Sequence, residues 1–214
     1  MMPIGILGGT FDPVHHGHLR LALECLEQAA LSQVRLIPLH TPPHRRGARA
    51  SGKQRLRMLE LATHGSDKLV IDDCELARGG TSYTIDTLKL QRERLGGTPV
   101  CLIMGMDAFQ TIHSWREWQS ILDYAHILVA DRPGEATHVE HGDVASIYRQ
   151  AATRDRQDLQ RAPAGKIFRI GMPLLEISAT RIRTIIGEGR DPHFLLPSAV
   201  IQFILKEKLY LTQS

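Results

Sequence analysis

Short apolar runs alternate with segments of helical periodicity along most of the chain, and this alternation constrains the fold more than any other feature. The alternation predicts an α/β fold: a Rossmann-like open parallel sheet with helices on both faces, in a single domain. In this class, ligands bind beyond the carboxyl ends of the strands. The predicted strands lie at residues 3–8, 34–39, 68–72, 100–104, 126–130 and 167–170.

The intervening segments carry their apolar residues on one helical face. Leu19, Leu23, Leu26 and Ala30 recur at i, i+4, i+7 and i+11, which predicts a helix that starts near His16. Further helices are predicted at residues 56–62, 85–95, 179–187 and 197–208. Ser178 is the expected N-cap of the helix at 179–187, and Pro197 the expected first residue of the last helix.

The composition is that of an ordinary globular protein. The chain has 214 residues, of which 43% are hydrophobic and 23% charged, so one domain over residues 1–214 is expected. Residues 135–165 are polar without clear periodicity, and we interpret them as a surface insertion with one or two helices. A net charge of +3 suits an anionic small molecule and is too weak to indicate nucleic-acid binding.

The cysteines argue for a reducing compartment. Cys25, Cys74 and Cys101 are odd in number and show no C-x-x-C spacing, so we expect buried, reduced thiols. We see no signal peptide, and no apolar run approaches the roughly 20 residues of a membrane span. We therefore expect a cytoplasmic protein without a membrane partner.

The segment that follows the first predicted strand is the most informative in the chain. It reads Gly8-Gly9-Thr10-Phe11-Asp12-Pro13-Val14-His15-His16-Gly17-His18. The two glycines allow a tight turn that a phosphate can approach closely, and a helix N-terminus points into the same space. His15 and His18 share a helical face and can donate to charge that develops on phosphate oxygens.

Two other interpretations of this segment were weighed. Histidines in a loop are usually solvated surface residues. His-x-x-His can also hold zinc, but no Cys or acidic third ligand lies at helical spacing. We therefore predict no metal site built from protein side chains.

A second anion site is predicted near residue 180, where the chain reads Ile177-Ser178-Ala179-Thr180-Arg181-Ile182-Arg183. The hydroxyls of Ser178 and Thr180 and the free N–H groups of a helix start can donate to phosphate. Arg183 adds a planar fork suited to a triphosphate. Taken alone, the segment also fits an ordinary capped helix with surface arginines.

Together, the two segments resemble the H-x-G-H and I-S-x-T-x-x-R signatures of the nucleotidyltransferase superfamily. The middle of the chain resembles one branch, the bacterial nicotinate-nucleotide adenylyltransferases, over nearly its whole length. The matching segments are Pro42-Pro43-His44-Arg45, Ser82 to Leu88, Gly105-Met106-Asp107 with Trp115 and Trp118 soon after, Arg132-Pro133-Gly134, Leu195-Leu196-Pro197-x-x-Val200 and Leu209-Tyr210. The chain departs from the family pattern at Arg45, where Lys is usual, and at Met106, Glu135 and Ala179.

The resemblance implies transfer of AMP from ATP to nicotinate mononucleotide, giving nicotinic acid adenine dinucleotide and pyrophosphate in NAD biosynthesis. It also implies Mg²⁺ held mainly by the ATP phosphates. His15, His18 and Arg183 are the expected catalytic residues. The remaining ATP-binding residues implied by the resemblance are Gly8, Gly9 and Thr10 at the reacting phosphates, Ser178 and Thr180 at the β and γ phosphates, and Gly105 and Asp107 at the ribose.

On the acceptor side, the resemblance implies that Trp115 stacks on the pyridine ring. Backbone N–H groups at Tyr83 and Thr84 are expected to bind the nicotinate carboxylate, and Arg45 and Arg132 the acceptor phosphate. We interpret Trp118 as a core residue, and Arg55 and Arg57 as a solvated helix face. For the histidines outside the first motif we expect surface or packing positions, namely His64, His113, His126, His138, His141 and His193.

Two alternatives remain open at this point. One is an adenylyltransferase of the same superfamily that uses nicotinamide mononucleotide or phosphopantetheine. The other is a non-catalytic nucleotide-binding protein. The sequence also leaves open a homo-oligomer.

Overall fold

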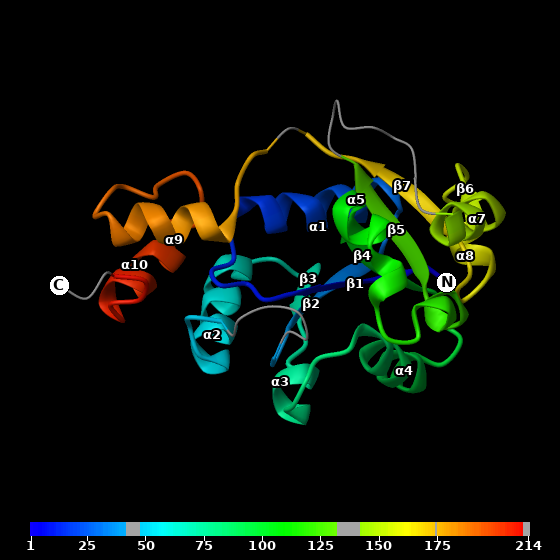
Figure 1. The fold of residues 1–214 in the computed structure, drawn as a ribbon, viewed down its shortest axis with the longest axis horizontal. Coiled ribbons are helices and arrows are strands. Elements are labelled where there is room, and N and C mark those ends of the chain that lie inside the picture. The colour runs from blue at the N-terminus through cyan, green and yellow to red at the C-terminus, as the bar shows by residue number, and fades with distance from the viewer. Residues whose placement is uncertain (42–47, 132–141, 174, 212–214) are drawn as a thin grey trace. The chain divides into compact units, whose positions relative to one another are not determined.

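A seven-stranded sheet forms the framework of the molecule, with strand order β3-β2-β1-β4-β5-β7-β6 (Figure 1). The structure, a computed structural model, describes residues 1–41, 48–131, 142–173 and 175–211. β4 pairs in parallel with β1 and β5, and β7 pairs in parallel with β5 and β6. The strands are β1 Ile4–Gly9, β2 Gln33–Pro38, β3 Leu69–Ile71, β4 Val100–Gly105, β5 His126–Asp131, β6 Ala152–Thr153 and β7 Ile167–Gly171.

The predicted α/β fold is therefore confirmed, together with each of its six strands. β6 was missed because a strand of two residues carries no alternation to detect. The fully apolar run at 100–104 is buried along its whole length in β4. Such burial is typical of a parallel strand covered on both faces.

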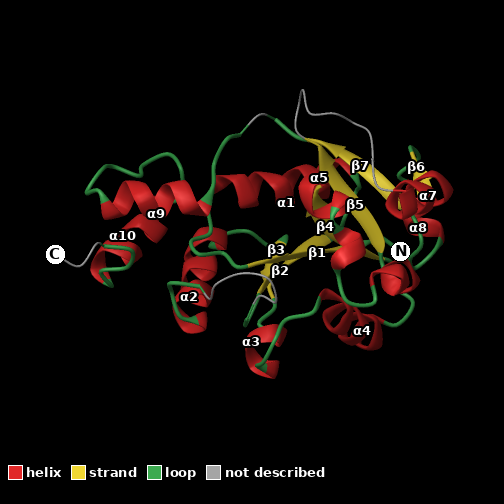
Figure 2. Ribbon diagram, in the orientation of Figure 1, coloured by secondary structure: helices red, strands yellow, loops and turns green. Residues whose placement is uncertain are grey.

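Helices occupy most of the connections between the strands (Figure 2). The helices are α1 His16–Gln28, α2 Gly52–Thr63, α3 Cys74–Arg78, α4 Thr84–Leu95, α5 Met106–Gln110, α6 Ile121–Tyr124, α7 Gly142–Ala151, α8 Asp158–Arg161, α9 Ala179–Gly187 and α10 Ser198–Lys206. The five predicted helices correspond to α1, α2, α4, α9 and α10. Pro197 is the N-cap of α10 and not its first residue. The helices without a prediction are too short to show a repeating apolar face.

The described chain forms two compact units. Unit 1 comprises Met1–Leu7, Leu21–Arg35 and Tyr83–Leu174, and unit 2 comprises Gly8–Arg20, Leu36–Ser82 and Leu175–Ser214. Each unit is assembled from three separate segments of the chain.

Unit 1 has an apolar core, and the polar side chains of Arg92 and His126 beside it are hydrogen-bonded to backbone groups. Arg92 on α4 donates to the carbonyl oxygens of Gly96, Thr98, Tyr124 and Pro163 at 2.6–2.8 Å. His126 is fully buried. One ring nitrogen of His126 contacts the Ala162 carbonyl at 2.9 Å, and the other accepts from the backbone N–H of Lys166 at 3.0 Å. The packing interpretation of His126 is thereby confirmed.

In unit 2, α2 packs against α10, and α9 buries Ile182, Ile185 and Ile186. Ser51 caps α2 through a capping box with Gln54, and this reciprocal pairing satisfies two N–H groups of the helix start. Ser178 caps α9 as predicted, since its hydroxyl accepts from the backbone N–H of Arg181.

The predicted insertion at 135–165 contains α7 and α8 as two helices, and β6 in addition. Residues 132–141 lie outside the described residues. Cys25, Cys74 and Cys101 are free and buried, as expected. Burial raises the pKa of the Cys25 thiol to about 12. In the described part of the chain, no helix has the length and apolar character needed to cross a membrane.

Candidate active site

Gly8 and Gly9 are the last two residues of β1, and they lie in unit 2. A side chain at Gly9 would place its Cβ 2.9 Å from the ring of Phe11, so only glycine fits there while Phe11 stays in place. Phe11 is buried and adopts a left-handed backbone with φ of 49°. The loop is therefore fixed by packing around one aromatic side chain.

The two motif histidines lie against each other, as their spacing predicts. The rings of His15 and His18 are stacked with centroids 3.7 Å apart, and Phe11 meets His18 edge-on at 5.0 Å. The backbone N–H of His15 donates to Nδ1 of His18 at 3.3 Å. Since Nδ1 accepts this bond, the proton of a neutral His18 resides on Nε2.

Burial keeps both rings neutral near pH 7. Desolvation, aided by the electrostatic interaction with His16, lowers the pKa of His15 to about 4. Desolvation, aided by His15, also lowers the pKa of His18 well below its usual value. A neutral imidazole still donates one N–H, so the pair can act as hydrogen-bond donors without a permanent charge.

Gly17 explains the glycine within the histidine motif. A Cβ at Gly17 would lie 3.0 Å from Nδ1 and 3.1 Å from Cε1 of the His15 ring. This spacing is tighter than ordinary van der Waals contact, so any larger residue would push the His15 ring aside.

The second motif contacts the first through Arg183 of α9. Nη1 of Arg183 donates to the backbone carbonyl of Asp12 at 2.6 Å, and Nη2 donates to the Thr180 hydroxyl at 3.1 Å. The structure thus brings together two motifs whose contacting residues, Asp12 and Arg183, are 171 residues apart. Ser178 and Thr180 are exposed at the start of α9, where a ligand can reach them.

Three residues of this region had no predicted role: Asp12, Arg55 and Tyr210. The interpretation of Arg55 as part of a solvated helix face is wrong, because Arg55 is 2% exposed and its Nη1 donates to the carbonyl of Thr10 at 2.8 Å. Arg57 does lie on a solvated face, with an exposed side chain paired to Glu60 at 2.7 Å. Arg55 and Arg57 are two residues apart and therefore lie on opposite sides of α2, and the charge pattern does not distinguish the two environments.

Asp12 is buried and connects several segments of unit 2. Its carboxylate accepts the backbone N–H groups of Arg49 and Ala50 at 2.8 and 3.1 Å, and the hydroxyl of Tyr210 at 2.7 Å. The sequence does hold one signal of this role: a carboxylate inside a motif predicted to bind phosphate disfavours an anionic ligand unless the carboxylate has its own donors.

Unit 1 carries the other predicted ligand residues. Gly105 ends β4 and is the N-cap of α5, whose first turn contains the exposed Asp107. Tyr83 is the N-cap of α4, which begins at Thr84, so the expected helix start is confirmed. Trp115 is half-buried after a 3-10 turn. Arg45 and Arg132 lie outside the described residues.

The side chains around Tyr83 form a charged cluster that the sequence did not indicate. The guanidinium of Arg116 lies 4.9 Å from the centre of the Tyr83 ring and 3.7 Å from the carboxylate of Asp86. Glu117 pairs with Lys89 at 2.6 Å. Positive and negative charges are therefore balanced beside the start of α4.

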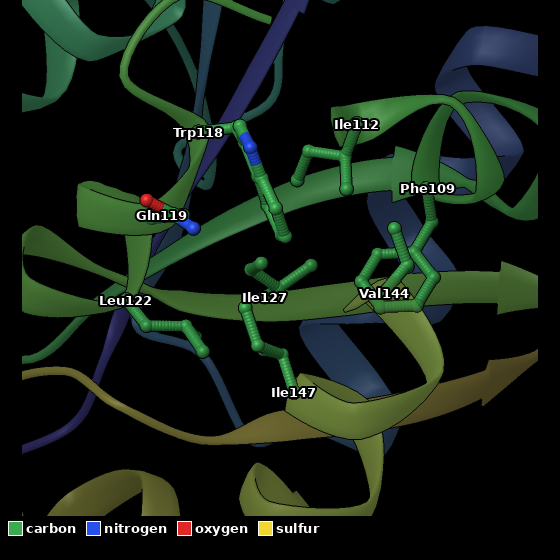
Figure 3. A pocket seen from close by; sticks show the side chains of 8 residues that line it. All are labelled: Phe109, Ile112, Trp118, Gln119, Leu122, Ile127, Val144 and Ile147. Atoms are coloured by element: carbon green, nitrogen blue, oxygen red, sulfur yellow. The ribbon is translucent and has the colours of Figure 1, made fainter. Parts of the chain in front are cut away.

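Trp118 lines a small apolar cavity of unit 1, which supports its interpretation as a core residue (Figure 3). The lining contains a single polar side chain, that of Gln119, so the cavity lacks the polar groups that would orient a nucleotide. Its other lining residues are Phe109, Ile112, Leu122, Ile127, Val144 and Ile147.

Comparison with known proteins gives concordant results. A model of the cytidylyltransferase-like family matches residues 6–185. A protein of Aeromonas salmonicida (strain A449) named probable nicotinate-nucleotide adenylyltransferase is 44% identical over 208 residues, which cover 97% of each chain. A protein of Marinobacter nauticus with the same name is 46% identical over 206 residues, covering 96% of this chain and 95% of its own.

Solved structures agree on the fold. Plasmodium falciparum nicotinic acid mononucleotide adenylyltransferase complexed with NaAD superposes with a TM-score of 0.73 at 19% identity, covering 98% of both chains. The same protein complexed with APC gives a TM-score of 0.72. The Rossmann-like architecture is therefore common to both proteins despite the low sequence identity.

Proposed function

The chain belongs to the cytidylyltransferase-like family and, within it, to the nicotinate-nucleotide adenylyltransferases, and from this premise we propose how its residues carry out the reaction. The enzyme transfers the adenylyl group of ATP to nicotinate mononucleotide, with nicotinic acid adenine dinucleotide and pyrophosphate as products. The observation that carries the proposal is the contact between the two motifs in unit 2, where Arg183 donates to Asp12 and Thr180.

The reaction needs no covalent intermediate. The phosphate of the acceptor attacks the α-phosphorus of ATP in line, the bond between the α-phosphorus and the α,β-bridging oxygen breaks, and the β and γ phosphates leave together as pyrophosphate. Positioning and charge neutralisation supply the acceleration. His18 donates from Nε2 to a phosphate oxygen, because its Nδ1 already accepts from the backbone of His15.

Arg183, Ser178 and Thr180 hold the β and γ phosphates in this proposal, at the N-terminus of α9. Ser178 and Thr180 are exposed there, and the free N–H groups of the first helical turn add to the anion site. Gly8, Gly9 and Thr10 allow the α-phosphate to approach the turn after β1.

Mg²⁺ is expected to be held mainly by ATP oxygens and water, and when bound it neutralises phosphate charge. The carboxylate of Asp12 has both oxygens engaged by protein donors, which fits a cation carried by the nucleotide. Within the described residues, no group of three or more His, Cys, Asp and Glu side chains could hold a metal ion.

For the acceptor, we assign the start of α4 to the nicotinate carboxylate and Trp115 to the pyridine ring. A helix start offers N–H groups to an anion, and an indole attracts a cationic pyridinium. Arg45 and Arg132 are proposed for the acceptor phosphate, and Gly105 and Asp107 for the ribose of ATP. The buried free thiols of Cys25 and Cys101 support the proposal of a cytoplasmic enzyme.

The decisive experiment measures pyrophosphate release by the purified chain with ATP and Mg²⁺. Nicotinate mononucleotide and nicotinamide mononucleotide are compared in parallel, with a control that lacks any acceptor. Strong preference for the acid supports the proposal. Equal use of both acceptors retains adenylyl transfer but contradicts carboxylate recognition at α4. No release from a folded sample contradicts the proposed function.

The catalytic role of His18 is tested by His18→Ala. Turnover should fall by at least about 10²-fold while ATP still binds, because a donor to the transition state is lost. Calorimetric titration with ATP separates binding from chemistry. His113→Ala, at an exposed histidine of unit 1, is the matched control and should keep full turnover.

A further inference from the structure

We propose that Tyr210 and Asp12 form a positioning pair that aims the guanidinium of Arg183 at the triphosphate. This inference rests on the proposed function, because it concerns a residue assigned to the phosphates of ATP. Neither Tyr210 nor Asp12 needs to touch the substrate. They act through the backbone of the loop that follows β1.

The carboxylate of Asp12 is held by three donors from two other segments of unit 2. Oδ2 accepts from the backbone of Arg49 at 2.8 Å, and Oδ1 accepts from the backbone of Ala50 at 3.1 Å and from the hydroxyl of Tyr210 at 2.7 Å. Asp12 is 5% exposed and Tyr210 8% exposed. A buried charge with this many partners has one favoured orientation, so the backbone of Asp12 is fixed as well.

The fixed backbone of Asp12 in turn orients Arg183. Its carbonyl accepts from Nη1 of Arg183 at 2.6 Å, while Nη1 lies 4.0 Å from the Asp12 carboxylate. The hydroxyl of Thr180 takes a second donor of the same guanidinium. Two of the five N–H donors of Arg183 are thereby engaged by the protein, which sets the plane in which the others lie.

The backbone is strained on both sides of this connection. Tyr210 has φ of 65° and Phe11, which precedes Asp12, has φ of 49°. Non-glycine residues persist in the left-handed region when their surroundings over-determine them, and they concentrate at functional sites. The phenol is also held in its protonated form, because burial and then the hydrogen bond to Asp12 raise the pKa of Tyr210.

The contact of Arg183 differs from a purely structural arginine contact. Nε of Arg183 is buried and no described residue accepts from it. The Arg183 side chain is 20% exposed, so a ligand can reach part of it. Because the guanidinium of Arg183 keeps a donor free of protein partners in the described part of the chain, we assign Tyr210 and Asp12 the role of positioning it.

A double-mutant cycle tests the inference. Tyr210→Phe removes the hydroxyl and keeps the ring, and Arg183→Lys removes the planar fork and keeps the charge. We expect Tyr210→Phe to lower kcat/KM about 10-fold in the parent enzyme and less than 2-fold in the Arg183→Lys background. Coupling of this size is expected only for residues that act through one another.

Controls separate this inference from the folding of unit 2 and from the proposed function. Tyr124→Phe, which removes a tyrosine hydroxyl in unit 1, should leave kcat/KM unchanged. Asp12→Asn supplies a second variant, since its amide N–H would face the backbone N–H of Arg49 and should reproduce the coupling. All variants are compared at a temperature where their circular dichroism is native.

The outcomes are distinguishable. If Tyr210→Phe lowers kcat/KM equally in both backgrounds, or lowers only the unfolding temperature, the positioning role is refuted while the proposed function stands. If the parent enzyme releases no pyrophosphate, the proposed function itself has failed. If Tyr210→Phe lowers kcat/KM in the parent enzyme but not in the Arg183→Lys background, the positioning role of Tyr210 and Asp12 is supported.

Discussion

Two buried histidines, one in each unit, use their polar atoms in opposite ways. His126 of unit 1 has both ring nitrogens engaged, by the Ala162 carbonyl and the Lys166 N–H. His15 of unit 2 is 5% exposed, and its Nδ1 has no hydrogen-bond partner among the described residues. An unpaired buried nitrogen costs stability. The buried histidine of unit 1 thus has both ring nitrogens paired, whereas His15, which we propose for catalysis, keeps Nδ1 unpaired within the described residues.

The arginines repeat the contrast. The guanidinium of Arg92 in unit 1 donates hydrogen bonds to four carbonyl oxygens. Arg55 and Arg183 of unit 2 each bury an Nε without a partner in the described structure. Functional sites commonly carry such incomplete pairing at the expense of stability. Among these residues, arginines and histidines of the same type differ in how many of their buried nitrogens have hydrogen-bond partners within the described residues.

The largest effect is expected from protonation of the buried His15 at acid pH, which should lower the free energy of unfolding. Its pKa is lowered from 6.5 to about 4 in the folded chain, so the unfolded chain binds more protons between these values. The stability contributed by neutral His15 is full above pH 6.5 and is lost as the pH falls towards 4. The free energy of unfolding should drop by on the order of 3 kcal/mol over this range.

Urea titrations at a series of pH values measure this slope. His15→Gln should reduce it, whereas His113→Gln, at an exposed position, should leave it unchanged. An unaltered slope in His15→Gln would show that His15 is not buried neutral.

Removal of the Arg92 guanidinium should cost stability without a catalytic defect. Arg92→Met removes the charged donor of four carbonyl oxygens. Because the side chain is half-buried, water can hydrogen-bond to some of these carbonyl oxygens in its place. We expect the free energy of unfolding to fall by about 2 kcal/mol. At temperatures where the variant is folded, its KM for ATP should match that of the parent. A changed KM would break the comparison between the units.

A smaller effect is expected from Gly17→Ala. The new methyl group must displace the His15 ring, from which it would lie only 3.0 Å. We expect kcat to fall about 10-fold, since misplacement of a catalytic group by a fraction of an ångström already lowers the rate. Gly97→Ala is the matched control, because a Cβ at Gly97 meets no atom within 4 Å. Equal rates in both variants would argue against a defined position for His15.

The smallest effect should come from filling the apolar cavity of unit 1. Val144→Ile adds one methylene group beside Trp118 and Ile127. We expect the free energy of unfolding to rise by about 0.5 kcal/mol with turnover unchanged. A decrease of more than about 1 kcal/mol would show that the cavity is too tight for the added group.

Local patterns predicted the parts of the molecule that are encoded locally. The apolar runs identified β1, β4 and β5, and helical spacing identified α1 and α9, because burial repeats with the period of the element. The proximity of His15 and His18 could also be predicted, since residues three apart at a helix start lie on the same face. The predicted catalytic and ligand roles stay predictions.

The Asp12 connection could not be predicted in this way. Its partners are the backbone of Arg49 and Ala50 and a phenol 198 residues away, and no periodicity links such positions. Arg55 was missed for a related reason. Its burial depends on the carbonyl of Thr10 that it contacts, and not on its place in α2.

The long distance in sequence between Asp12 and Tyr210 also has a consequence during synthesis of the chain on the ribosome. Ribosomes add roughly 5–20 residues per second, so roughly 10–40 s pass between the synthesis of the two residues. During that interval the loop after β1 exists without its hydroxyl partner. The nascent chain therefore carries its histidine motif long before Tyr210, which follows α10, is made and can donate to Asp12.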